Sequence, residues 1–131
     1  MTLVLDTSVL IDHLRGDPRA HRLVTALDAQ GEALSASVLT KVELLAGMRA
    51  TERAKTRRLI EAIDWLEVDD DLGERAGALA SRFLPSHPDL ELVDYVIAAT
   101  TERLGAGLLT RNRKHFPMFP ELRDPYLPPP E

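Results

Sequence analysis

Three carboxylates in this chain stand where the sequence places them beside apolar surface, a setting in which they could bind a divalent cation. Asp6 follows the short apolar run 3–5, which predicts a buried strand. Glu43 lies on the border of the apolar stripe of a predicted helix, and Asp94 lies beside the apolar face of another. A carboxylate that is partly removed from water needs a cation or hydrogen-bond donors.

Neutral oxygen donors near these acids narrow the choice of metal. Thr7 and Ser8 directly follow Asp6, and Asn112 comes just after a later predicted strand. Hard oxygen ligands of this kind suit Mg²⁺ or Mn²⁺ and not zinc. The chain has no cysteine, which excludes a disulfide, a thiolate zinc site and a cysteine nucleophile.

Each acid also has an ordinary structural interpretation that stays open at this level. Asp6 could cap a helix, and Glu43 could complete a capping box or point into solvent. Asp94 could serve only the dipole of the helix whose first turn it occupies. We expect Asp12 to be solvated. We expect the acidic run 69–71 to form the start of a helix and to have no catalytic role.

Short apolar strands alternate with longer helices along the chain, a pattern that predicts parallel β-α-β units. The predicted strands are 3–5, 33–36, 65–68 and 108–110. The predicted helices are 9–14, 19–29, 37–48, 51–63 (capped by Thr51), 69–84 and 92–104. Ligand sites in such sheets form beyond the carboxyl ends of the strands. From about residue 117 the chain is a Pro-rich tail, with at most a short edge strand near Leu122 and mobile last residues.

Length and composition limit the class of protein. A chain of 131 residues, 44% hydrophobic and 28% charged, predicts one globular domain over residues 1–131. It contains no apolar run of the ~18 residues that a membrane span needs. Its start lacks the basic flank of a signal peptide, so we expect a cytoplasmic protein. The formal net charge of −5 argues against binding nucleic acid by bulk charge alone.

Four motifs surround the candidate ligands. They are 5–11 (LDTSVLI), 37–40 with Glu43, Leu44 and Gly47, 94–99 (DYVIAA) and 109–116 (LTRNRKHF). In this order, and over nearly the whole chain, the motifs resemble those of PIN-domain ribonucleases, specifically the VapC-type toxins of bacterial toxin–antitoxin modules.

The resemblance implies a PIN-like (Rossmann-like) α/β fold, a parallel sheet of four to five strands with helices on both faces. It implies a Mg²⁺-dependent endoribonuclease with an acidic site of Asp6, Glu43 and Asp94, a homodimer, and a VapB-like antitoxin that neutralises the toxin. Relatives often carry a fourth acid at the position of Asn112 or His115. Both are neutral here, so we expect weaker metal binding and no tightly held second ion. We expect His115 to pack or to contact phosphate.

The implied mechanism is hydrolysis of a phosphodiester beside the bound cation. Asp6 and Asp94 would hold the ion, with Glu43 joining directly or through a water. A metal-activated water would attack phosphorus in line and expel the ribose 3′ oxygen, leaving a 5′-phosphate.

Two groups of residues outside the acids are candidates for binding partners. Arg111, Arg113 and Lys114 follow the last predicted strand and could contact RNA phosphates, or form an ordinary solvated basic loop. The core stripe predicted for helix 37–48 is Val38, Leu39, Val42, Leu45 and Ala46. Leu44 and Met48 would then be exposed, as part of a dimer or antitoxin surface.

Two alternatives belong to other functional classes. A phosphoacceptor receiver domain has this size and an acidic Mg²⁺ site, but it needs adjacent acids after the first strand, where this chain has Asp6 and Thr7. A catalytically silent PIN-like module that binds RNA or protein is the second, because a fold alone does not determine function.

Overall fold

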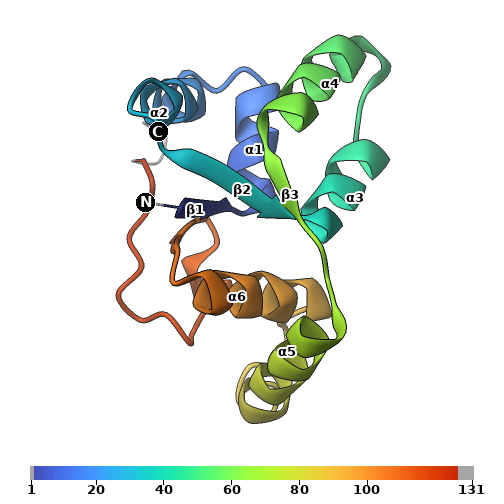
Figure 1. Cartoon of the computed structure of the whole chain (residues 1–131), viewed down its shortest axis with the longest axis vertical. Helices are drawn as coiled ribbons and strands as arrows, with labels where there is room; N and C mark the ends of the chain where they lie inside the picture. The colour runs from blue at the N-terminus through green and yellow to red at the C-terminus, as the bar shows by residue number, and fades with distance from the viewer. Residues whose placement is uncertain (1, 127–131) are drawn as a thin grey trace.

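A four-stranded, wholly parallel sheet organises the chain in the computed structural model, which describes residues 2–126 (Figure 1). Its strands are β1 (Thr2–Leu5), β2 (Ala33–Ser37), β3 (Asp64–Leu66) and β4 (Gly107–Leu109), in the spatial order β3-β2-β1-β4. Val4 of β1 pairs with Ser35 of β2 on one side and with Leu108 of β4 on the other. The strand order therefore reverses at β1, and ligand sites in parallel sheets form beyond such a reversal.

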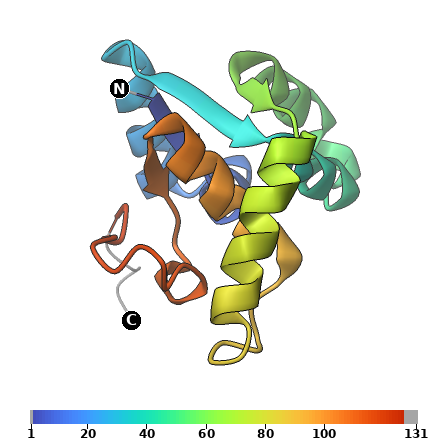
Figure 2. The ribbon, with the colours of Figure 1, turned by 60° about the horizontal axis from the view of Figure 1, so that its bottom comes forward.

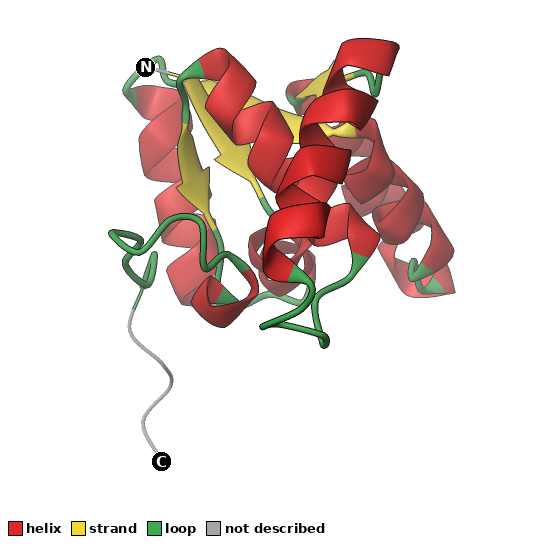
Figure 3. Cartoon of the chain, turned by 90° about the horizontal axis from the view of Figure 1, so that it is seen from below, coloured by secondary structure: helices red, strands yellow, loops and turns green. Residues whose placement is uncertain are grey.

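Helices cover both faces of this sheet, which confirms the predicted architecture. They are α1 (Thr7–Leu14), α2 (Pro18–Ala29), α3 (Val38–Ala46), α4 (Arg53–Ala62), α5 (Asp70–Phe83) and α6 (Leu92–Leu104). Figure 1 shows α1, α2 and α4 on one side of the sheet and α6 on the other, with α5 beyond it. Figure 2 shows α5 beside α6, and Figure 3 shows the strands between the red helices. Because both faces are covered, the central strand is apolar on both: Val4 and Leu5 are each fully buried.

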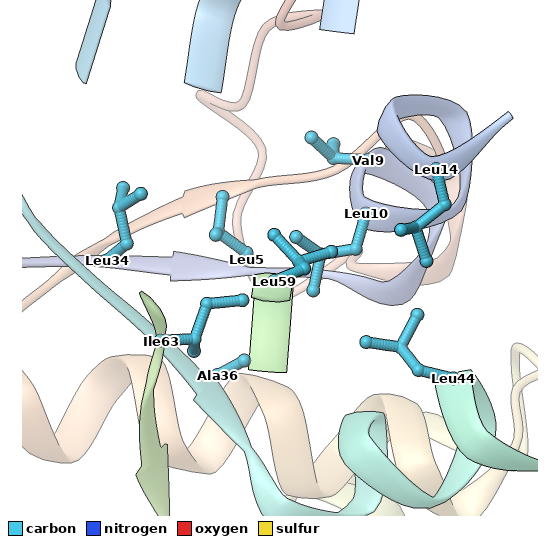
Figure 4. Close-up of a cluster of buried hydrophobic side chains, with 9 residues drawn as sticks. All are labelled: Leu5, Val9, Leu10, Leu14, Leu34, Ala36, Leu44, Leu59 and Ile63. Atoms are coloured by element: carbon cyan, nitrogen blue, oxygen red, sulfur yellow. The ribbon is translucent and has the colours of Figure 1, made fainter. Parts of the chain in front are cut away.

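Buried apolar side chains form a cluster on each side of the sheet. The cluster beneath α1 and α4 consists of Leu5, Val9, Leu10, Leu14, Leu34, Ala36, Leu44, Leu59 and Ile63 (Figure 4). The cluster beneath α6 consists of Val4, Ile97, Ala98, Leu108 and Phe116. Each fully buried side chain of this size contributes about 1.5–3 kcal/mol through removal from water. The sheet is thus held rigidly between two cores, and its strand ends are fixed supports for polar side chains.

Local signals set several helix ends as the sequence predicts. The Asp69 carboxylate accepts a hydrogen bond from the backbone N–H of Leu72 (2.8 Å), so the acidic run does open α5. Asp17 accepts from the N–H of Arg19 at the start of α2 (2.9 Å). Helix α6 ends at Gly105, whose φ of +58° is a left-handed conformation that favours glycine.

The predictions for the region around α3 and α4 are wrong in two respects. Thr51 does not cap a helix; a 3₁₀ turn (Ala50–Glu52) precedes α4, and the Glu52 carboxylate accepts from the N–H of Arg49 (3.0 Å). Leu44, predicted to be exposed, is buried, whereas Val42 of the predicted core stripe is 59% exposed. The reason is that α3 packs against α1 through Thr40 and Leu44, so its apolar stripe is not its buried face.

The Pro-rich segment that begins at residue 117 packs against the domain. Met118, Phe119 and Leu122 contact the cluster beneath α6. The predicted edge strand near Leu122 is wrong, because this part of the chain turns: the N–H of Leu122 donates to the carbonyl of Phe119 (3.2 Å). The last residues, for which mobility is expected, lie outside the described part. Within residues 2–126, no helix has the length and apolar character to cross a membrane.

Candidate acidic active site

Asp6 sits in the gap between β1 and α1 and is almost completely buried, with 6% of its surface exposed. Its backbone N–H donates to the carbonyl of Leu109 (2.9 Å), which fixes it beside the end of β4. Its Oδ2 accepts hydrogen bonds from the hydroxyls of Thr110 (2.7 Å) and Ser8 (2.9 Å). Although Asp6 occupies the N-cap position of α1, its side chain makes no capping hydrogen bond. Helix capping therefore does not explain this carboxylate.

Asp94, in the first turn of α6, faces the same polar site. Its Oδ2 accepts from the backbone N–H of Glu91 (3.0 Å), so Asp94 also caps the start of this helix, a role that was not predicted from the sequence. Its side chain is only 13% exposed. Burial raises the pKa of Asp94, and the nearby charge of Asp6 raises it further, while the Glu91 hydrogen bond and His115 act in the opposite direction. The charge of Asp6 thus acts on Asp94, although the two carboxylates come from distant parts of the chain.

Glu43 is linked to this end of the sheet by a hydrogen bond from Thr7. On α3, its Oε1 accepts a hydrogen bond from the Thr7 hydroxyl (2.7 Å), which also lies 3.4 Å from the hydroxyl of Thr40. Because Thr7 directly follows Asp6, the first turn of α1 connects the two acids. The Glu43 residue is exposed, unlike the other two carboxylates. The structure therefore places Glu43 on the solvent side of the site.

The donor set fits a hard divalent cation, although the side chains do not converge fully. In the described part of the chain, no three acidic or histidine side chains lie close enough together to hold one ion. Asp6 and Asp94 nevertheless form a desolvated pair of like charges, and neither has an ion pair with Lys or Arg among residues 2–126. A cation bound between them would offset the repulsion that raises the pKa of Asp94. We therefore take Asp6 and Asp94 as the core of the site.

Two residues of the loop after β4 have roles that the sequence reasoning missed. The buried Thr110 hydroxyl donates to Asp6 and accepts from the backbone N–H of Asn112 (2.9 Å), so it ties this loop to the acid. Its position at the end of the predicted strand 108–110 was the available signal. His115 Nδ1 lies 3.5 Å from Asp94 Oδ2, so its neighbour is an acid. The side chain of Asn112 is exposed beside these groups.

Comparison with known proteins agrees with this architecture. The family model described as "PIN domain" matches residues 3–121. The chain belongs to the PIN-domain family. It is 45% identical to Ribonuclease VapC19 of Mycobacterium tuberculosis over 94% of this chain and 98% of that protein, and 36% identical to Ribonuclease VapC10 of the same species over 97% and 95%. These identities assign it to the VapC group, so the receiver-domain alternative is wrong.

Solved structures give the same result for the PIN fold. A toxin–antitoxin complex from Klebsiella pneumoniae contains a chain that superposes with a TM-score of 0.77 and 29% identity, over 95% of this chain and 98% of the other. The structure of VapBC2 from Rickettsia felis bound to a promoter DNA fragment gives a TM-score of 0.78 over 93% and 96%; its identity of 18% supports the fold alone.

The three basic residues proposed above as RNA contacts differ in their hydrogen-bond partners. Arg111 donates to the carboxylate of Asp12 (2.8 Å), and Arg113 donates to that of Asp124 (3.0 Å). Lys114 is exposed. The expectation that Asp12 is solvated is wrong: its side chain is 19% exposed because the arginine and the C-terminal segment cover it.

A cavity of about 660 Å³ lies between α1, α2 and α4 of the PIN domain and contains none of the three acids. His13 and His21 stack within it, with ring centroids 5.4 Å apart. Burial, followed by the nearby charges of His21 and Lys55, lowers the pKa of His13, whose Nδ1 is buried without a hydrogen-bond partner. The cavity is therefore a separate feature and does not enter the chemistry of the acids.

Proposed function

We propose that this chain is the toxin of a VapBC-type toxin–antitoxin module and cleaves RNA at the site of Asp6 and Asp94 with the help of a divalent cation. The observation that supports this proposal is the pair of largely buried carboxylates, Asp6 after β1 and Asp94 in α6, neither of which has an ion pair with Lys or Arg within residues 2–126; His115 lies 3.5 Å from Asp94. The VapC relatives, which are named ribonucleases, support this proposal.

The ligands proposed for Mg²⁺ or Mn²⁺ are Asp6 and Asp94, with Glu43 contributing directly or through a water. When bound, the cation would neutralise the scissile phosphate and lower the pKa of a water molecule. The hydroxyls of Thr110 and Ser8 hold Oδ2 of Asp6, so the carboxylate enters the reaction already oriented. This preorganisation matters because a ligand that must first rotate costs conformational entropy at binding.

Glu43 is the residue best placed to accept the proton of the attacking water, since it is the exposed carboxylate of the three. The attack on phosphorus breaks the bond to the ribose 3′ oxygen and leaves a 5′-phosphate on the downstream fragment. The 2′-hydroxyl takes no part. Lys114, with Arg111 and Arg113 beside it, would contact the phosphates of the RNA.

The decisive experiment follows cleavage of labelled RNA while Mg²⁺ is titrated. We expect cleavage that EDTA abolishes, and a loss of about 100-fold or more in both Asp6→Asn and Asp94→Asn, because each removes a charge that the cation needs. Asp71→Asn, on the surface of α5, is the control and should cleave normally. A folded parent that binds RNA without cleaving it would support the silent PIN module instead.

A second substrate tests the mechanism itself. An RNA with one deoxynucleotide at the cleaved position should still be cut, because the 2′-hydroxyl is not the nucleophile. Loss of cleavage, together with a 2′,3′-cyclic phosphate from the ordinary substrate, would refute the proposed attack by water.

The proposed partner is a VapB-like antitoxin, and the proposed assembly is a homodimer that the antitoxin neutralises in the cytoplasm, where the RNA is. Support comes from the Klebsiella pneumoniae neighbour, whose structure is a toxin–antitoxin complex. Light scattering of the purified chain tests the dimer. Restored growth on co-expression of the protein encoded by the adjoining reading frame tests the antitoxin.

A further inference from the structure

Arg111 is fixed to the acidic site through its backbone. Its N–H donates to the hydroxyl of Ser8 (3.1 Å), and that hydroxyl donates to Asp6. The residue before it, Thr110, donates to the same carboxylate oxygen. Two hydrogen bonds to one buried acid therefore set where the Arg111 main chain lies relative to the site.

A second set of contacts fixes the guanidinium of Arg111. Its Nη1 donates to Asp12 Oδ2 (2.8 Å), and the hydroxyl of Tyr126 donates to the same oxygen. The Tyr126 ring lies 5.9 Å from Cζ of the arginine. The Arg111 side chain is nevertheless 40% exposed, and within residues 2–126 its guanidinium donates to no acceptor other than Asp12. An arginine has five N–H donors, so most of them remain available.

We propose that Asp12 and Tyr126 are positioning residues, which hold Arg111 ready to bind one phosphate of an RNA strand at the acidic site. The identity of the ligand rests on the proposed ribonuclease function. A planar guanidinium binds phosphate best when its orientation is fixed beforehand, because two parallel N–H groups must meet two oxygens. The hydrogen bond from Tyr126 satisfies part of the charge of Asp12, so the arginine keeps positive potential for the phosphate.

Binding of a labelled single-stranded RNA of mixed sequence, measured by fluorescence anisotropy in EDTA, tests this proposal. We expect Arg111→Ala to weaken binding about tenfold and to reduce the slope of log K against log salt by about one. Tyr126→Phe keeps the ring and removes the hydroxyl, and it should weaken binding about threefold. The double variant should bind no more weakly than Arg111→Ala. Asp71→Asn is the matched control and should not change binding.

Cleavage kinetics distinguish positioning of Arg111 from a general structural role, because KM and kcat are measured separately. Tyr126→Phe and Asp12→Asn should raise KM and leave kcat within about twofold, because they alter a contact made before the chemical step. Three results would overturn the proposal: an effect of Tyr126→Phe that persists in full in the Arg111→Ala background, tighter RNA binding by Asp12→Asn, or unchanged binding by Arg111→Ala. Tighter binding would mean that Asp12 shields the arginine from RNA.

The two proposals fail separately. A parent chain that binds RNA through Arg111 but cleaves none with Mg²⁺ would refute the proposed function and leave this inference standing. Metal-dependent cleavage with RNA binding that Arg111→Ala does not change would refute this inference alone. A parent that binds no RNA at all would refute both.

Discussion

Replacing Thr110 by valine tests how much its hydrogen bond to Asp6 contributes to stability. The side chains have nearly the same shape, so the change removes one hydroxyl without opening a cavity. Thr110 is 1% exposed, and its hydroxyl donates to the buried Asp6 carboxylate at 2.7 Å. A hydrogen bond to a charged group contributes about 1.5–3 kcal/mol, and within residues 2–126 the Asp6 side chain would retain the Ser8 hydroxyl as its one donor. The change also removes the acceptor of the Asn112 N–H. We expect Thr110→Val to lower the free energy of unfolding by about 2 kcal/mol at neutral pH.

The comparison variant is Thr100→Val, which removes a threonine hydroxyl that donates to a neutral acceptor. Thr100 is also 1% exposed, and its hydroxyl donates at 2.7 Å to the backbone carbonyl of Val96, a neutral acceptor inside α6. Its loss should cost about 1 kcal/mol or less. Urea unfolding of both variants in EDTA, followed by circular dichroism, gives the comparison. Equal or smaller destabilisation by Thr110→Val would refute the claim that a charged Asp6 depends on this hydroxyl.

Three further predictions concern the acid pair, a histidine and a helix end. Asp94→Asn should abolish metal-dependent cleavage. It should nevertheless raise the melting temperature in EDTA, because it removes a charge that burial and the nearby Asp6 disfavour. An unchanged or lower melting temperature would contradict this prediction. The folded-state pKa of His13 lies below its ordinary value of 6.5, so the stability linked to it is complete above that pH and falls as the pH drops below it. Melting between pH 5 and 7.5 should therefore show a smaller acid loss in His13→Gln than in the parent. Gly105→Ala should cost about 1 kcal/mol in urea unfolding, since alanine is strained at a φ of +58°; a neutral effect would show that the helix end adapts.

The best-predicted parts of the fold are those whose signals are local. Helix α6 was predicted with its observed ends, 92 and 104, because its apolar face and the glycine that follows it are both visible in the sequence. Helix α3 was placed correctly but rotated wrongly. Its apolar stripe includes Val42, which is exposed, whereas the buried Thr40 faces polar groups of α1. Periodicity counts apolar residues and cannot recognise a buried face that is partly polar.

In the candidate site, too, the residues with local sequence signals were predicted and those that depend on long-range contacts were not. The three acids were chosen from their position beside apolar runs, and in the structure the charge of Asp6 acts on Asp94 and raises its pKa. Thr110 and His115 were not assigned to them, because each acts on a carboxylate from a distant segment. Their roles depend on which strands become neighbours, and no local pattern reports that for β1 and β4.

The pairing of β1 with β4 has a consequence for when the protein becomes active. The first strand emerges early from the ribosome, but its neighbour and the threonine that holds Asp6 are separated from it by 104 positions. At about 5–20 residues per second, the nascent chain spends several seconds with its first acid lacking these partners. A chain that ends before Gly107 lacks β4 and Thr110, although it still contains Asp6, Glu43 and Asp94. Each unfinished copy therefore lacks the strand beside β1 and the Thr110 hydroxyl until translation passes this point.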